Sequence, residues 1–372
     1  MKNLIVFVIL SLFVIFFLIG LFVGVYKIFP YSEINEIKNQ FESQPVNLDL
    51  ESYEIINLHD IISIKNESDI ILKRDQLTKL IWDTDEIPKS LPTSIENNII
   101  DTRFSNIPNL KQIDKLTIEM KHGLNSVVYI FSPEKNNGKI ILYHQGHAGD
   151  FIHGKHTIQK FIDSGFSVAA FSMPLLGLNN QPIIELENRG PTKFIKHNQL
   201  VMLESDDFST LSYFFSPIAI TLNYLDRNYS VDDYIMVGIS GGGWASTIYP
   251  AVDTRISKSF SIAGSFPLSM RNNVDDVGDY EQFHPDLYSI SNYPELYILN
   301  SFGDNKEFTQ IFIENDPCCF SGKIYEMYPY ENIIDQKLLL LGKGQFSVYV
   351  DSSTNKHEIS PYTIELILNN IT

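Results

Sequence analysis

The sequence predicts an α/β protein with a mostly parallel, doubly wound sheet. From about residue 113 onward, short apolar runs alternate with segments of helical periodicity. Several of these runs are continuously apolar, which is typical of parallel strands buried on both faces. A predicted hairpin opens the series, so the sheet should begin with an antiparallel N-terminal edge. One long apolar stretch before all of this predicts a transmembrane helix.

Composition narrows the class of protein. The chain has 372 residues, 44% of them hydrophobic and 20% charged, which is ordinary for a globular protein. Its formal charge of −17 argues against a nucleic-acid partner, because an acidic surface repels phosphate. Three regions are expected: an anchor at 1–27, an accessory region at 28–105, and a main domain at 106–372.

The N-terminal stretch from Leu4 to Tyr26 carries no charge. As a helix it would be about 34 Å long, enough to cross a bilayer core. The alternative is a cleaved signal peptide, but Tyr26-Lys27-Ile28-Phe29 is a poor cleavage site. We therefore expect a single-pass membrane protein. The charge bias of the flanks is weak and favours a main domain outside the cytoplasm.

The elements follow in chain order. In the accessory region, Arg74–Trp82 has apolar residues at helical spacing and is followed by Pro88. The main domain should contain strands at Leu116–Met120, Ser126–Phe131, Lys139–His144, Phe166–Phe171, Tyr234–Gly238, Ile256–Ala263, Phe308–Glu314 and Gln345–Val350. Helices are expected at Lys155–Ser164, Phe208–Leu225, Gly241–Tyr249, Ile333–Leu341 and Pro361–Leu368.

The strongest chemical signal is Gly238-Ile239-Ser240-Gly241-Gly242, which matches G-x-S-x-G. It follows a buried strand and precedes a predicted helix, which is the setting that a nucleophile elbow requires. Glycines on both sides leave room for the sharp turn. The N–H of Gly241 can face an oxyanion. A glycine-rich turn without chemistry is the simpler alternative, but the strand–turn–helix context argues against it.

With this motif and these predicted elements, the segment 113–372 resembles the α/β-hydrolase superfamily. The hairpin, the strand and turn KIILYHQGHAG, the strand and turn FSVAAFSMPLLG, and the elbow GISGGG occur in the chain order of that superfamily. The resemblance covers about two-thirds of the chain. It implies a serine hydrolase, and it says little about the substrate.

The resemblance also implies the order serine, acid, histidine for the catalytic triad. His357 follows the last predicted strand, where the superfamily carries its general base; His284, in an apparent insertion, is the weaker candidate. The acid should be Asp316, in a strand end of the form Asp-Pro. Asp304 is the alternative, since Leu296–Ser301 can also be read as a strand.

A second oxyanion donor is implied at the turn His144-Gln145-Gly146-His147-Ala148-Gly149, where the superfamily has an HG-type turn. Aligning Gly146 with its glycine makes the backbone N–H of His147 the donor. The histidines at 144, 147, 153 and 156 form two H-x-x-H spacings. No accompanying E-x-x-H or H-E-x-x-H pattern supports a metal site, so we expect neither a metal nor a cofactor.

Two insertions, near 174–207 and 265–305, are candidates for a lid over the site or for surface extensions. The second is aromatic and acidic. Cys318 and Cys319 are the only cysteines. Adjacent cysteines rarely meet disulfide geometry, so we expect small packing residues rather than a bridge.

The sequence thus predicts a membrane-anchored carboxylic-ester hydrolase with an acyl-enzyme intermediate and a small-molecule or lipid-like ester substrate. Two alternatives stay open. One is a peptidase or amidase with the same triad, because the triad is shared across bond types. The other is a catalytically silent binding module held at a membrane.

Overall fold

The computed structural model describes residues 14, 16–18, 20, 58–187, 189–271, 278–327 and 329–372. The chain divides into two units, Met1–Glu54 and Ile55–Thr372. In the first unit the few described residues are helical. No helix among the described residues has the length and apolar character needed to span a membrane. The predicted anchor at 1–27 lies almost wholly outside the described residues.

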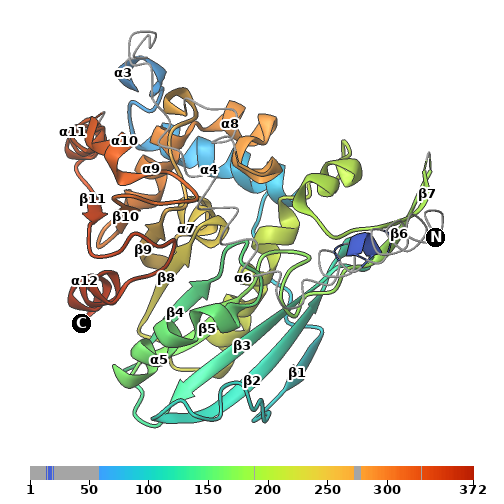
Figure 1. The fold of residues 1–372 in the computed structure, drawn as a ribbon. Coiled ribbons are helices and arrows are strands. Elements are labelled where there is room, and N and C mark those ends of the chain that lie inside the picture. The colour runs from blue at the N-terminus through green and yellow to red at the C-terminus, as the bar shows by residue number, and fades with distance from the viewer. Residues whose placement is uncertain are drawn as a thin grey trace, which may run out of the picture. The chain divides into compact units, whose positions relative to one another are not determined.

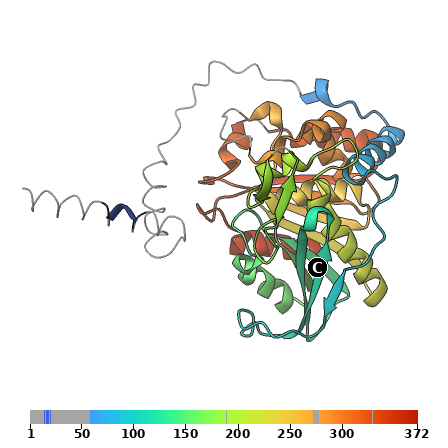
Figure 2. The ribbon, with the colours of Figure 1, turned by 90° about the vertical axis from the view of Figure 1, so that its right-hand side faces the viewer.

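The second unit is built on a mixed sheet of nine strands in the order β1-β2-β3-β5-β4-β8-β9-β10-β11. Strands β1, β2 and β3 pair antiparallel, β3 pairs antiparallel with β5, and all pairs from β5 to β11 are parallel. Figure 2 shows the antiparallel edge in teal, facing the viewer. The strands are β1 (Ser94–Glu96), β2 (Leu110–Glu119), β3 (Asn125–Pro133), β4 (Lys139–His144), β5 (Ser167–Phe171), β8 (Asp233–Ile239), β9 (Ile256–Ile262), β10 (Glu307–Ile313) and β11 (Gln345–Asp351).

Helices cover both faces of this sheet. The α-helices are α3 (Leu58–Ile61), α4 (Glu67–Trp82), α5 (Lys155–Asp163), α6 (Ser212–Asn228), α7 (Gly241–Val252), α8 (Pro285–Ile290), α9 (Tyr293–Ser301), α10 (Gly322–Met327), α11 (Glu331–Leu341) and α12 (Pro361–Ile371). The short 3-10 helices are η2 (Lys121–Gly123), η3 (Phe151–Gly154), η4 (His197–Leu203), η5 (Leu268–Met270) and η7 (Tyr280–Phe283).

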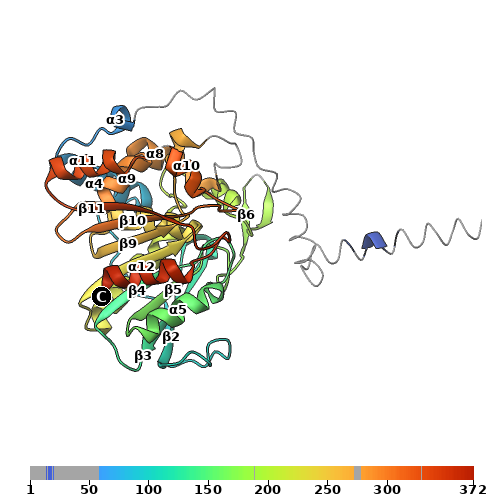
Figure 3. The same cartoon turned by 60° about the vertical axis from the view of Figure 1, so that its left-hand side comes forward.

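Two hydrophobic clusters show how the layers pack. One joins α4, α6, α7 and α9 to one face of the sheet, where Figure 1 shows α4, α8 and α9 together. The other joins α5 and α12 to the opposite face, and Figure 3 shows these two helices side by side. Neighbouring residues of one strand go to different clusters, as Ile141 and Leu142 of β4 do. This alternation gives the predicted doubly wound, mostly parallel sheet with an antiparallel edge.

The two insertions contain elements that the sequence pattern did not predict. The first contains a separate two-stranded hairpin, β6 (Ile183–Leu186) and β7 (Gly190–Lys193), followed by η4. In the second, Leu296–Ser301 is not a strand but the body of α9. A capping box between Asn292 and Glu295 starts this helix, and Pro294 favours its first turn. The capping residues therefore determine that this apolar run forms a helix and not a strand.

The described part of the accessory region belongs to the same compact unit as the sheet. Strand β1 extends the antiparallel edge by pairing with β2. Helix α4 starts at a capping box between Asn66 and Asp69 and buries Ile70, Leu77 and Ile81 in the larger cluster. The described residues 58–105 therefore brace the sheet and share its core.

Candidate active site

The candidate site lies at the carboxyl ends of the parallel strands. Ser240 follows β8, the turn with His147 follows β4, Asp316 follows β10, and His357 follows β11. Because parallel strands end at the same edge of a sheet, these segments all lie at one edge of the sheet. The topology thus brings together residues that are more than 200 positions apart in the sequence.

Ser240 occupies a strained turn between β8 and α7. Its φ of 56° and ψ of −125° lie outside the regions that L-residues ordinarily adopt. Its flanking glycines are required by contact. A Cβ on Gly238 would lie 2.0 Å from the carbonyl oxygen of Gly242, and one on Gly242 would lie 2.0 Å from the carbonyl oxygen of His144. The turn therefore presents the serine at the sheet edge, half-buried, as a nucleophile elbow does.

Asp316 and His357 form a hydrogen-bonded pair. His357 Nδ1 lies 2.8 Å from Asp316 Oδ2 and 3.1 Å from Oδ1, and the Asp316 side chain has no exposed surface. The Asp316 carboxylate also accepts hydrogen bonds from the backbone N–H groups of Cys318 and Cys319. The other ring nitrogen, His357 Nε2, is buried and has no hydrogen-bond partner among the described residues. That nitrogen remains available to a substrate or a nucleophile.

The alternative acid lies elsewhere. Asp304 is 83% exposed and lies 4.0 Å from Lys343. It follows helix α9 rather than a strand of the sheet. Of the two acids that the sequence suggests, Asp316 is the one that contacts His357.

The turn after β4 packs closely against the elbow. A Cβ on Gly146 would lie 2.6 Å from both Ser240 Cβ and the carbonyl oxygen of Ile239. On the other side, a Cβ on Gly241 would meet the imidazole ring of His147 at 2.6 Å. Gly241 opens α7, so its N–H has no acceptor within the helix. The turn after β4 and the elbow can therefore pack this closely only because Gly146 and Gly241 have no side chains.

A cavity of about 470 Å³ opens beside Ser240. This volume falls within the range of ordinary small-molecule sites. The lining combines small and polar residues with one aromatic ring: His147, Ser240, Gly241, Ala263, Gly278, Asp279, Gln282, Cys318, Cys319 and Phe320. Gly278, Asp279 and Gln282 belong to the second insertion, which therefore shapes the wall of the cavity.

The expectation for the two cysteines was wrong. Cys318 and Cys319 are joined in a disulfide, and both are partly or fully exposed at the cavity instead of packed in the core. The Asp316 carboxylate bonds to both of their backbone N–H groups and curls the chain into a tight turn. This turn brings the two side chains to the surface of the cavity. Their sulfur atoms and a His357 ring nitrogen lie within 4.8 Å of one another.

The remaining histidines divide among several roles. His144 is buried and stacks on Phe171, and this burial lowers its pKa to about 4. His153 and His156 are exposed. His284 is buried and bonds to Glu204, outside the triad segments. The H-x-x-H spacings in the sequence therefore do not define a common cluster.

One cluster beside the site escaped sequence reasoning. His147 lies against His197 of the first insertion and against Asp279 and Glu281 of the second. Burial lowers the pKa of His147, but hydrogen bonds to Asp279 and Glu281 outweigh it and raise that pKa to about 10. Only the acidic character of the second insertion hinted at this group, because its members come from three distant segments.

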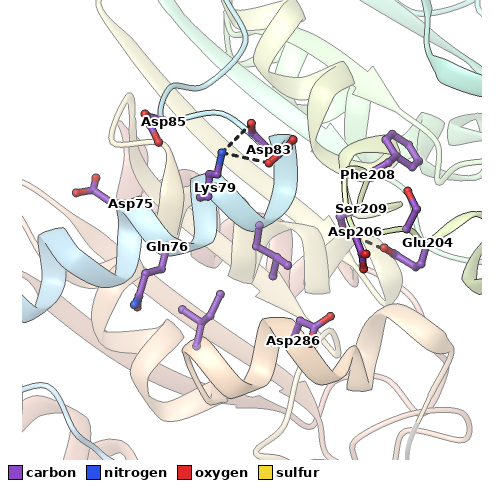
Figure 4. Close-up of a pocket in the computed structure, with 13 residues that line it drawn as sticks. Asp75, Gln76, Lys79, Asp83, Asp85, Glu204, Asp206, Phe208, Ser209 and Asp286 are labelled. Carbon is purple, nitrogen blue, oxygen red and sulfur yellow. Dashed lines mark hydrogen bonds and ion pairs between the residues drawn. The ribbon is translucent and has the colours of Figure 1, made fainter.

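A second cavity, of about 720 Å³, lies between α4, the 204–209 segment and α8 (Figure 4). It shares no lining residue with the cavity at Ser240. Figure 4 shows Lys79 of α4 paired with Asp83, the residue that caps the C-terminus of this helix, while Asp75 and Asp286 line other parts of the wall. The cavity is open and acidic, and its lining contains neither Ser240 nor the His357–Asp316 pair.

Comparison with known proteins identifies the fold. No protein-family profile matches the sequence, and no curated protein matches it. Solved structures do match. Acetyl xylan esterase 1 from Thermoanaerobacterium is 13% identical, with a TM-score of 0.53 over 84% of this chain and 97% of that one. An acetyl xylan esterase from Paenibacillus is 12% identical, with a TM-score of 0.50 over 85% and 99%.

A glucuronoyl esterase from Solibacter usitatus is also similar, at 10% identity and a TM-score of 0.54 over 81% of this chain and 90% of that one. At these identities the likeness concerns the fold. The mostly parallel mixed sheet, with helices on both faces, fits the α/β-hydrolase fold. The resemblance that the motifs suggested therefore holds at the level of architecture.

Proposed function

We propose that this protein is a carboxylic-ester hydrolase with a serine nucleophile. Ser240 attacks the acyl carbonyl, and His357 accepts the hydroxyl proton and returns it to the leaving alcohol. Asp316 holds the imidazole tautomer and stabilises the imidazolium. The backbone N–H groups of Gly241 and His147 bind the oxyanion of the tetrahedral intermediate. Water then attacks the acyl-enzyme. His357 accepts a proton from this water and returns it to Ser240 Oγ as the acid product leaves.

The observation that carries this proposal is the coexistence of two independent features at one sheet edge. One is the strained backbone of Ser240, which glycines at 238 and 242 make possible. The other is the His357–Asp316 pair, whose geometry leaves Nε2 as the free nitrogen. Strain of this kind costs about 1–3 kcal/mol and persists where the surrounding structure holds it in place.

The preference for esters is supported by the described activities of structurally similar proteins. The solved structures named above are described as acetyl xylan and glucuronoyl esterases. The cavity beside Ser240 is compact and partly polar. We therefore propose a small acyl ester as the substrate class. The ester-to-amide ratio of turnover tests this proposal against the amidase alternative.

The test is intact-mass analysis of the full chain after treatment with a fluorophosphonate. We expect a single adduct on the parent protein, none on Ser240→Ala, and an unchanged adduct on Ser289→Ala, a matched exposed serine. Hydrolysis of 4-nitrophenyl acetate should follow the same pattern and exceed that of the acetanilide. A folded parent without an adduct or turnover would contradict the proposal and favour a silent binding module.

We further propose that Leu4–Tyr26 anchors the enzyme to a membrane, with the catalytic unit outside the cytoplasm. This rests on the uncharged length of the stretch, about 34 Å as a helix. Such an anchor would suit a lipid-like ester. After alkaline carbonate extraction of expressing cells, the full chain should stay in the membrane pellet. Its release into the supernatant would contradict the anchor.

A further inference from the structure

Four potential metal ligands converge beside the oxyanion turn. They are His147, from the turn after β4; His197, at the start of η4; and Asp279 and Glu281, at η7. One ligand atom from each lies within 4.8 Å of all the others. His147 Nε2 is 2.9 Å from His197 Nδ1 and 3.0 Å from both Asp279 Oδ2 and Glu281 Oε1. The His197 Nδ1 to Glu281 Oε1 distance is 3.1 Å.

These distances are those of ligands around a common centre. Zinc bound by imidazole nitrogen and carboxylate oxygen at about 2.0–2.1 Å in a tetrahedron would separate its ligand atoms by about 3.3–3.4 Å. Four of the six separations between these ligand atoms, at 2.9–3.1 Å, are slightly shorter than that, and the other two are within 4.8 Å.

The hydrogen-bond pattern of the two imidazoles suits a shared cation better than shared protons. His197 Nε2 lies 2.9 Å from the carbonyl oxygen of Pro174, which can only accept, so Nε2 carries a proton. In a neutral ring His197 Nδ1 is then a lone pair, yet it faces Glu281 Oε1, which is also an acceptor. His147 Nε2 can donate one hydrogen bond but meets three acceptors. Protons alone would require a doubly protonated His197, and they would leave two N–H donors, His147 Nε2 and His197 Nδ1, facing each other at 2.9 Å.

A second, independent observation concerns Glu281. Its side chain is fully buried, and its other oxygen, Oε2, has no hydrogen-bond partner among the described residues. A buried carboxylate without full compensation is costly unless a positive charge lies close by. A divalent ion bound by both imidazoles and both carboxylates would supply that charge in place of a protonated His147. The bond from His197 Nε2 to Pro174 is also the kind of outer contact that fixes the tautomer of a metal-binding histidine.

We propose that His147, His197, Asp279 and Glu281 bind a single divalent metal ion of the zinc type. Two imidazole nitrogens with two carboxylate oxygens suit zinc better than magnesium or calcium, which prefer all-oxygen sites. The ion would be structural, since four protein ligands close its coordination sphere. It would tie the two insertions to the turn that carries the proposed oxyanion donor, and so hold the wall of the cavity in place.

The experiment measures metal content and does not depend on catalysis. The full chain is stripped with EDTA, offered Zn²⁺, Mg²⁺ or Ca²⁺, passed through gel filtration and analysed by elemental mass spectrometry. We expect one zinc per chain and no retained magnesium or calcium. Zinc should raise the Tm by about 5 °C. Ser240→Ala should bind zinc fully, so a failure of the proposed hydrolase and a failure of this site can be told apart.

Substitutions locate the ion. His197→Gln and Glu281→Gln should lose at least nine-tenths of the zinc, whereas the exposed His153→Gln and Asp286→Asn should keep it. If the two buried variants do not fold, Asp279→Asn, whose side chain is 40% exposed, carries the test through a weaker zinc affinity. Cobalt bound to the parent should show the visible spectrum of a four-coordinate ion. A folded parent that retains no zinc, or ligand variants that retain it fully, would overturn the proposal and leave a cluster held by protons.

Discussion

At the residue scale, the acid of the candidate triad does two things at once. The carboxylate of Asp316 accepts from two backbone N–H groups of the following turn and also faces His357 Nδ1. An asparagine could keep the turn, since its carbonyl oxygen can still accept. Its amide nitrogen would then face His357 and favour the wrong imidazole tautomer. The two roles can therefore be separated by one substitution.

For Asp316→Asn we expect kcat to fall by roughly 10³–10⁴ while the fold is kept, because the base would carry its proton on Nε2. Steady-state ester hydrolysis measures the loss, and circular dichroism checks the fold. Asp304→Asn is the matched control and should be near parent level, since that side chain is exposed. Equal losses in both variants would remove Asp316 from the triad.

At the element scale, a carboxylate joins the two insertions. Glu204, just after η4, accepts hydrogen bonds from Thr210 N at 2.8 Å, from Tyr280 OH at 2.5 Å and from His284 Nε2 at 3.2 Å. Partial burial raises its pKa, but these bonds outweigh burial and lower it to about 2 from an ordinary value of 4.5. The folded state thus binds this proton less readily than the unfolded state.

The sign of the pH dependence follows from this shift. The stability that ionised Glu204 contributes should be present in full above about pH 4.5 and be lost as the pH falls toward 2. Its size is at most about 3 kcal/mol, from 1.36 kcal/mol per pKa unit. We expect Glu204→Gln to lower the free energy of urea unfolding at pH 7, with a difference from the parent that shrinks below pH 4.5. Exposed Glu187→Gln should show neither effect, and a pH-independent difference would contradict the assignment.

At the scale of the whole molecule, hydrogen bonds from α4 attach the described part of the accessory region to the helices α7 and α9, which cover the sheet. The half-buried guanidinium of Arg74 donates to the carbonyl oxygens of Ala251 at 3.1 Å, Leu299 at 2.7 Å and Phe302 at 3.1 Å. These carbonyls lie at the ends of α7 and α9, where helices carry unpaired acceptors and partial negative charge. Burial lowers the pKa of Arg74. The three carbonyl acceptors oppose this effect, because they stabilise the charged guanidinium.

We expect Arg74→Ala to lower the free energy of unfolding by about 2–4 kcal/mol, because it leaves several buried carbonyls without a donor. Equilibrium denaturation followed by tryptophan fluorescence measures this change. Lys79→Ala, on the same helix, breaks only an exposed pair with Asp83 and should cost at most about 0.5 kcal/mol. Similar small losses for both would mean that α4 contributes little to the stability of the unit.

Local sequence patterns were sufficient to predict most strands of the sheet. The apolar runs at 139–144, 234–238 and 308–314 became β4, β8 and β10, because buried parallel strands need continuous apolar side chains. The elbow was readable because strand, serine and glycines are adjacent in the chain. Leu296–Ser301 was ambiguous, since a buried helix and a buried strand share an apolar composition, and the cap at Asn292 decided it.

What the sequence determined by itself was the class of architecture, the position of Ser240 on a turn, and a short list of acids and histidines. Only the tertiary structure chose Asp316 over Asp304 as the partner of His357, exposed the Cys318–Cys319 pair at the cavity, and joined His147 to His197 and Glu281. Backbone patterns arise from neighbours a few residues apart. Contacts between loops depend instead on which strand ends the sheet places side by side, and no local pattern encodes that.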